Sequence, residues 1–245
     1  MISVGCPVYL HNSLDPNYSS VVLLLKGENN NGSTTFTDDG PLRFVPTSSV
    51  ATVNTTTIAK FGQGSIFSTG TYRIQYATST TYSQSAFANS IWCMETWVYL
   101  PFGLYGTFPS NEFTLGNNAN SPSTPNWTWA TTYIEVYTGA AFHRCPTSTP
   151  AAATWHHVVV QKNTTTNSAS TSSVDFWLNG TKLVASLGGT WSTGATQPFQ
   201  VGRGDGAARP ARYLDEFRIT IGALRYTPNA PTITVPDREY GYAPR

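Results

Sequence analysis

The stretch YLDEFRITIGALRY, residues 213–226, decides the fold. Its side chains alternate between two faces with the period of a β-strand, and an aromatic turn follows Gly222. Asp215 has the phase of the apolar face, where a carboxylate is costly to bury unless it is hydrogen-bonded or bound to a cation. The pattern therefore predicts a strand with one buried face, and a partner for Asp215 elsewhere in the chain. That apolar face is predicted to carry Tyr213, Phe217, Ile219 and Ile221.

The rest of the chain repeats this kind of pattern. Short apolar or alternating runs are separated by Gly, Pro, Asn and Ser turns, and the Asn179-Gly180 pair is a strong hairpin signal. No eleven-residue window has a capped helical period, so no helix is expected. The sequence thus predicts an all-β, two-sheet antiparallel jelly-roll sandwich. The predicted strands are 21–26, 42–45, 51–53, 65–67, 72–76, 91–100, 111–115, 127–137, 140–144, 155–162, 174–178, 182–187, 199–201 and 213–221.

The composition narrows the function classes. Of the 245 residues only 11% are charged, the aromatic share is 13%, and the formal net charge is +1. A chain without a basic patch is not expected to bind nucleic acid. No run approaches the roughly 20 apolar residues of a membrane span, and the N-terminus lacks the charged and apolar parts of a signal peptide. Membrane insertion and signal-peptide export are therefore not expected.

The cysteines are three and widely spaced. Cys6, Cys93 and Cys145 exclude a disulfide framework and a C-x-x-C metal site. Cys93 lies in a strand-like run and is expected to pack as a small hydrophobe. One disulfide, Cys6–Cys145, stays open.

Seven motifs follow one another in a fixed order. Together they resemble the concanavalin A-like lectin/glucanase superfamily in its laminin G-like form, and the DEFRIT…RYT ending resembles modules of tailed-bacteriophage structural proteins. The resemblance covers residues 15–236 and implies two stacked antiparallel sheets with the first and last strands adjacent. The motifs are DPNYSSVVLLL (15–25), NGSTTFTD (31–38), KFGQGS (60–65), ETWVYL (95–100), WHHVVV (155–160), FWLNG (176–180) and the pair LDEFRI (214–219) and LRYT (224–227).

The resemblance sets the expected organisation and function. Residues 1–14 would form an N-terminal arm, 15–236 the sandwich and 237–245 a C-terminal tail. The favoured hypothesis is a non-enzymatic protein of the virion surface, as a capsid decoration, head-fibre or small tail-fibre component. Its arm and tail would contact other virion proteins or further copies in a homo-oligomer, and it would bind host or environmental glycans. The alternative is a stand-alone carbohydrate-binding lectin, with a glycoside hydrolase less favoured.

The carboxylates argue against catalysis. Glycoside hydrolases need two carboxyl groups a few ångströms apart, which on a strand requires alternate residues. Asp215 and Glu216 are adjacent, and Glu95 and Glu135 each stand alone in a strand. No enzyme activity is therefore expected.

A structural calcium ion is a second implication of the resemblance. Asp215 together with Asp38, Asp39 or Glu28 offers the oxygen ligands that calcium prefers. Family members often carry an acidic residue shortly after the Leu-Leu-Leu run. Here the sequence at 26–29 is KGEN, so a metal ligand at that place is shifted or lost. In the alternative, Asp215 accepts hydrogen bonds from backbone N–H groups of the early loop, and no cofactor is required.

Aromatic side chains near Asn, Ser and Thr suggest where a sugar would stack. The candidates are Trp191, Trp127, Trp129 and Tyr133. The last three share one strand phase, so packing in the core is the alternative for them.

Overall fold

The computed structural model describes residues 15–81, 83–101, 110–115, 126–130, 132–138, 142–185, 188–191, 193, 198–203 and 211–240. These residues form a short 3-10 helix, one α-helix and thirteen strands. The elements are η1 (Tyr18–Ser20), β1 (Val21–Leu25), β2 (Pro46–Thr55), β3 (Ser65–Thr78), α1 (Gln84–Asn89), β4 (Trp92–Tyr99), β5 (Ser110–Leu115), β6 (Asn126–Ala130), β7 (Tyr133–Tyr137), β8 (Phe142–Pro146), β9 (Trp155–Lys162), β10 (Val174–Leu178), β11 (Thr181–Leu183), β12 (Pro198–Arg203) and β13 (Arg212–Ile221).

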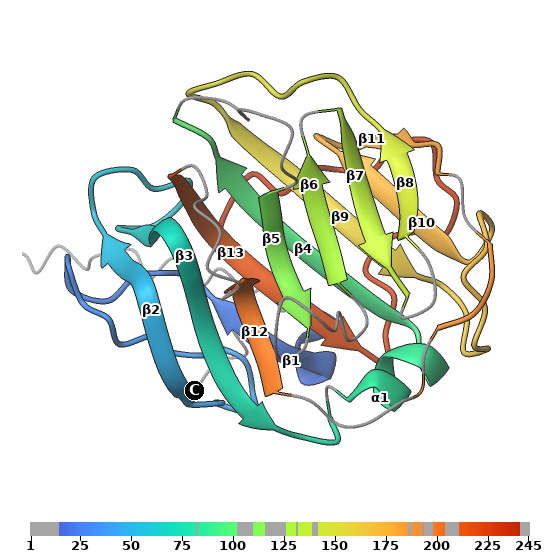
Figure 1. Cartoon of the computed structure of the whole chain (residues 1–245), viewed down its shortest axis with the longest axis horizontal. Coiled ribbons are helices and arrows are strands. Elements are labelled where there is room, and N and C mark those ends of the chain that lie inside the picture. Colours follow the sequence, from blue (N-terminus) through green and yellow to red (C-terminus); the bar gives the residue numbers. More distant parts are fainter. Residues whose placement is uncertain are drawn as a thin grey trace, which may run out of the picture.

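The strands form two stacked layers (Figure 1). One layer has the order β11-β10-β9-β4-β13, with β1 also paired to β13, and the other has the order β3-β12-β5-β6-β7-β8. The long strand β3 joins them, because its start pairs with β13 and its end pairs with β12. All pairings are antiparallel, and the first and last strands are adjacent. The predicted all-β sandwich is confirmed.

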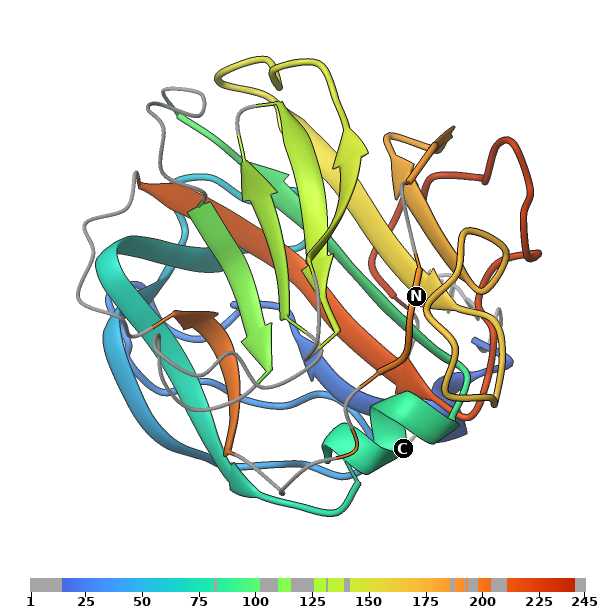
Figure 2. The same ribbon diagram turned by 45° about the vertical axis from the view of Figure 1, so that its right-hand side comes forward.

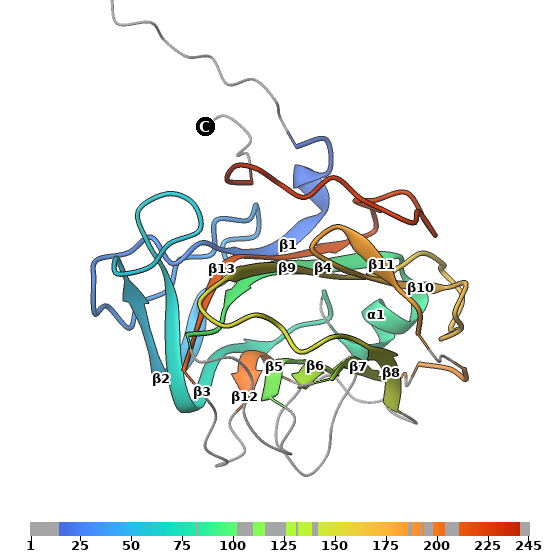
Figure 3. The same ribbon diagram turned by 90° about the horizontal axis from the view of Figure 1, so that it is seen from above.

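A short helix, which the sequence analysis did not predict, lies at one end of the sandwich (Figure 2, Figure 3). The hydroxyl of Ser83 accepts the backbone N–H of Ala86 and caps α1. Phe87 from this helix is fully buried and packs edge-on against Trp92, with ring centroids 5.6 Å apart. At six residues the helix is too short for a periodic signal, and tertiary packing stabilises it.

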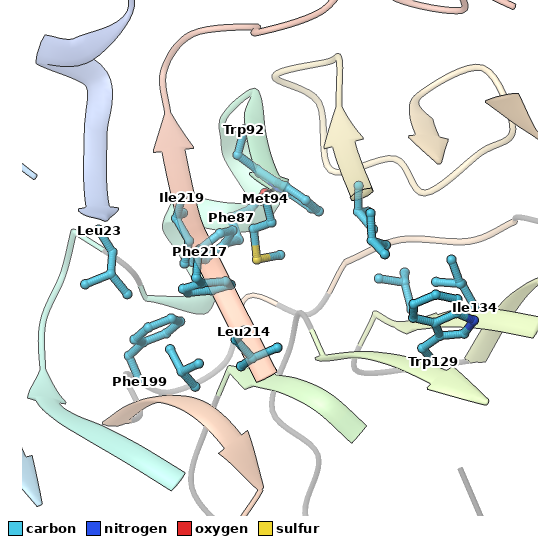
Figure 4. Close-up of a cluster of buried hydrophobic side chains, with 14 of the residues drawn as sticks. Leu23, Phe87, Trp92, Met94, Trp129, Ile134, Phe199, Leu214, Phe217 and Ile219 are labelled. Atoms are coloured by element: carbon cyan, nitrogen blue, oxygen red, sulfur yellow. Dashed lines mark hydrogen bonds between the residues drawn. The ribbon is translucent and has the colours of Figure 1, made fainter. Parts of the chain in front are cut away.

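The hydrophobic core lies between the layers (Figure 4). Leu23, Met94 and Phe217 project into it from one layer, and Trp129 and Phe199 from the other. Burying a side chain of this kind contributes roughly 1.5–3 kcal/mol each. Contacts between the two layers therefore contribute substantially to the stability of the sandwich.

A β-bulge in β13 corrects the predicted position of Asp215. The pairing with β4 shifts between Asp215 and Arg218, and Glu216 adopts a left-handed φ of 51°. One extra residue reverses the alternation, so that Leu214 and Phe217 both face the core. Asp215 consequently lies on the outer face of its layer, and not on the face of Phe217 as the simple period predicts.

The C-terminal strap (residues 222–240) crosses the outer face of the β4–β9–β10–β13 layer (Figure 3). The side-chain oxygen of Gln161 accepts the backbone N–H groups of Arg225 and Tyr226, both at 3.1 Å. Further along, the indole of Trp177 donates to the carbonyl of Ala230 at 3.0 Å. The part of this face around Gln161 and Trp177 is thus covered by the strap instead of water.

Several strand bounds differ from the prediction. Residues 42–45 are not a strand, the runs 65–67 and 72–76 belong to the single strand β3, and 127–137 contains β6 and β7. The predicted tail begins inside the strap, where Tyr240 is buried. The arm 1–14 and residues 241–245 lie outside the described residues.

The structure describes two of the three cysteines and also bears on the prediction that no segment spans a membrane. Cys93 and Cys145 are buried free thiols. Burial raises the pKa of both thiols. Cys6, the other half of the Cys6–Cys145 alternative, lies outside the described residues. Within the described ranges, no helix is long and apolar enough to cross a membrane.

The predicted hairpin at Asn179-Gly180 is confirmed, with φ of 50° and 82° as a type I′ turn requires. A Cβ atom on Gly180 would lie 2.8 Å from the carbonyl oxygen of Ile233 in the strap and 2.8 Å from the Val235 side chain. We expect Gly180→Ala to lower the free energy of unfolding by about 1–3 kcal/mol, measured by urea denaturation. Gly188→Ala is the control, because that Cβ would meet nothing within 4 Å, and an equal loss in both variants would contradict this account.

Candidate functional site

Two of the predicted sugar-stacking residues are core residues. Trp191 is only 2% exposed, its indole N–H donates to the carbonyl of Ser168 at 2.9 Å, and its ring packs edge-on against Trp92. Trp129 is fully buried and packs edge-on against His156. Neither ring can stack on a sugar, so both assignments are wrong. The physical reason is that inward-facing aromatic side chains fill the space between the layers.

The other two predicted sugar-stacking residues, Trp127 and Tyr133, lie on neighbouring strands. Trp127 pairs with Val136 between β6 and β7, but its side chain lies outside what the structure describes. Tyr133 is partly exposed on β7, on the face opposite to the buried Ile134 and Val136. Of the four, Tyr133 is the residue with a side chain described at the surface.

The carboxylates of Asp38 and Asp39, two of the proposed calcium ligands, are bound by groups of the protein itself. Asp38 is buried and accepts the backbone N–H groups of Leu24, Gly40 and Phe44 at 2.8–2.9 Å. Burial raises the pKa of Asp38, against the effect of these three donors. Asp39 forms an ion pair with Arg43 at 3.2 Å. Both side chains hold the loop that follows β1.

Asp215 also has backbone partners from the early part of the chain. Its Oδ2 accepts the N–H groups of Lys60 and Phe61 at 2.8 and 3.1 Å, and its Oδ1 accepts that of Glu216 at 2.8 Å. Burial raises the pKa of Asp215 to about 7 even so. Glu28 is exposed, and its own pKa is raised by partial burial and by the charge of Glu239. Among the described residues, no three His, Cys, Asp or Glu side chains are grouped as a metal site would require.

The outer face of β7 and β8 carries a polar and aromatic cluster. Tyr133, Glu135 and Tyr137 alternate with buried residues along β7, and Arg144 lies directly across from Glu135 on β8. The Nε of Arg144 donates to Glu135 at 3.0 Å, and its guanidinium lies 4.6 Å from the centre of the Tyr133 ring. We call these four residues the β7–β8 surface.

In this surface the guanidinium of Arg144 is exposed, whereas its partner Glu135 is buried. The side chain of Glu135 is 5% exposed, whereas that of Arg144 is 58% exposed. The hydrogen bond to Glu135 raises the pKa of Arg144, so its charge persists at every relevant pH. Because Glu135 engages Nε, the two terminal nitrogens of the guanidinium remain available to a ligand. The surface thus offers two partly exposed rings beside a fixed cation.

Sequence reasoning found only part of this surface. Glu135 was noted as a single carboxylate and Tyr133 as an aromatic candidate, but Tyr137 and Arg144 were missed. The signal was the polar phase of the run at 133–137. Arg144 becomes a neighbour only through the register between β7 and β8, which no local pattern specifies.

The opposite layer buries a second charged cluster, around Glu95. Its Oε1 lies 2.5 Å from Nε of Arg225, and its Oε2 accepts the hydroxyl of Tyr226 at 2.6 Å and lies 3.4 Å from Nε2 of His157. Burial alone would raise the pKa of Glu95, but Arg225, His157 and Arg218 hold it below its usual value. The side chain of Glu95 is fully buried, so this cluster is structural.

Comparisons with known proteins support the fold. The chain aligns with the binding domain of Paraclostridial Mosquitocidal Protein 1 at a TM-score of 0.60 and 13% identity, covering 85% of this chain and 50% of the toxin domain. It aligns with domain 4 of AbnA, a GH43 extracellular arabinanase from Geobacillus stearothermophilus, at a TM-score of 0.56 and 18% identity. This alignment covers 84% of this chain and 94% of the arabinanase domain. A sialidase from Trypanosoma rangeli aligns at a TM-score of 0.54 and 12% identity, over 82% of this chain and 31% of the sialidase.

These similarities concern the fold, which is that of concanavalin A-like lectin domains. The chain spans about half of the toxin binding domain and nearly all of the arabinanase domain. No protein-family model matches the sequence. No curated protein matches it either.

The carboxylate geometry leads to a prediction about calcium. We expect the melting temperature to be the same in EDTA and in millimolar calcium, because Asp38 and Asp215 already accept three backbone N–H groups each. Differential scanning calorimetry measures this. A rise of several degrees in calcium that Asp215→Asn abolishes would establish the calcium site instead.

Proposed function

We propose that this protein is a non-enzymatic carbohydrate-binding domain that holds glycans on the β7–β8 surface. The observation that carries the proposal is the Glu135–Arg144 pair between two partly exposed tyrosine rings on a rigid sheet face. Side chains on strands keep their positions better than side chains on loops. A shallow, preformed surface of this kind suits the binding of a sugar chain.

The four side chains divide the work of recognising a sugar. The rings of Tyr133 and Tyr137 present apolar faces and edges to the C–H groups of a pyranose or furanose. The exposed nitrogens of Arg144 donate to hydroxyl oxygens, and Glu135 keeps the guanidinium in place. The stacking supplies affinity, and the charge-assisted hydrogen bonds select the orientation.

The same pair argues against glycoside hydrolysis. A hydrolase needs a second carboxyl group opposite the first, to act as acid while the other acts as nucleophile or base. The described partner of Glu135 is the guanidinium of Arg144, and not a second carboxyl group. Glu95 and Glu216 are buried and engaged with protein groups. We therefore propose binding without turnover.

The ligands and descriptions of the structurally similar proteins support this proposal. The arabinanase domain was solved in complex with arabinotriose, and the sialidase in complex with sialic acid. The matched part of the mosquitocidal toxin is described as a binding domain. These similarities favour a lectin-like domain over virion architecture as the first function of this chain.

A location on the virion surface is the second proposal, and the sequence motif DEFRIT…RYT favours it. In that setting the domain would be a capsid decoration, head-fibre or small tail-fibre component. Its partners would be other virion proteins or further copies of itself, and the β7–β8 surface would bind host or environmental glycans.

The binding proposal is tested on an array of neutral and acidic oligosaccharides, followed by titration calorimetry with the best ligand. We expect Tyr133→Ala and Arg144→Gln each to weaken binding about tenfold, because each removes one contact to the sugar. Arg238→Gln is the matched control, since Arg238 is also exposed and pairs with a neighbouring carboxylate at 3.1 Å. No ligand on the array, or equal affinity of all three variants and the unaltered protein, would refute the proposal.

A further inference from the structure

The outer face of the β4–β9–β13 layer carries a row of aromatic side chains that the strap leaves uncovered. Phe67 of β3 pairs with Tyr213 of β13, which pairs with Tyr99 of β4, which in turn pairs with Trp155 of β9. Neighbouring ring centroids are 4.7, 5.7 and 5.5 Å apart along this order. All four side chains are partly exposed. We call them the aromatic row.

The strap covers the neighbouring part of the same face. Its polar contacts reach Glu95, Gln161 and Glu216, and the last residue it buries there, Tyr240, lies against His157. Within the described part of the chain, no hydrogen bond or ion pair joins the strap to the aromatic row. The four rings of the row, which are partly exposed, thus lie beside the strap without a polar contact to its described residues.

A cation that pairs with no carboxylate among the described residues lies at the edge of the row. The ammonium of Lys60 lies 4.0 Å from the ring centre of Trp97 and 5.3 Å from that of Phe61. Trp97 is on the same face of β4 as Tyr99, two residues earlier. Lys60 forms no ion pair with a described carboxylate. The carboxylate of Asp215 accepts the backbone N–H groups of Lys60 and Phe61, and these hydrogen bonds hold the lysine in this position.

We propose that the aromatic row and Lys60 form a second binding site, which takes an acidic oligosaccharide. The rings are spaced like adjacent strands, so the row runs across the sheet and offers successive contacts to an extended sugar chain. Tyrosine and tryptophan combine an apolar ring with a hydrogen-bonding tip, which suits the mixed surface of a sugar.

The charge of Lys60 selects the ligand class. An ammonium that lies beside aromatic rings, with no carboxylate partner among the described residues, is complementary to an anion on the ligand. A carboxylate-bearing sugar chain supplies both the anion and the apolar ring faces. The site lies on the opposite layer of the sandwich from the β7–β8 surface and does not depend on it (Figure 3).

The test compares tetragalacturonate with its methyl ester, in which the same chain carries no charge. We expect the full chain to bind the acid about tenfold more tightly than the ester in titration calorimetry. Lys60→Gln should remove this preference, and Trp155→Ala should weaken the binding of both ligands about tenfold. Arg238→Gln, which removes an exposed arginine outside both surfaces, should leave the preference unchanged.

Two results would overturn this second site while leaving the β7–β8 surface intact. Either the acid binds no tighter than the ester, or the preference survives Lys60→Gln. A second measurement needs no variant: acetylation of Lys60 by acetic anhydride, followed by peptide mass spectrometry. Tetragalacturonate should slow the acetylation of Lys60 severalfold and the ester should not, and equal rates with and without the acid would contradict the site.

Discussion

The buried carboxylate of Glu95 is the constraint on which the outer face of the β4–β9–β13 layer depends. A lone carboxylate at that depth would be strongly destabilising, so it needs cations and donors from elsewhere in the chain. Arg218 comes from the neighbouring strand, whereas Arg225 and Tyr226 come from the strap. Asp15 contacts both arginines and ties the start of the domain to its end. The strap must therefore close for this layer to be stable.

Closure of the strap determines which surfaces are left for binding. Over most of one layer, outward-facing side chains such as Trp177 and Gln161 are committed to the strap. The uncovered aromatic row remains at one end of that layer, and the β7–β8 surface lies on the other layer. Both surfaces combine aromatic rings with a cation, and both are built on strands. The two proposed glycan sites therefore lie on opposite faces of the sandwich, outside its core.

The sequence predicts this architecture well wherever alternation is regular. Trp155–Lys162 and Val174–Leu178 were predicted with their observed bounds, because period two and flanking turns are local signals. Asp215 was placed on the wrong face because one bulged residue reverses the phase. The candidate site was harder to predict. Whether Trp191 is core or surface depends on tertiary packing, and the contact between Arg144 and Glu135 depends on strand register.

The central claim is that glycans bind to strand residues on the β7–β8 surface. Chemical-shift mapping by NMR, with the best array ligand added stepwise to the labelled full chain, tests it most directly. The account predicts that the amide signals of Tyr133, Glu135, Tyr137 and Arg144 move together, while those of the strap stay in place. Shifts confined to the strap, or no shifts on β7 and β8 at saturating ligand, would contradict it.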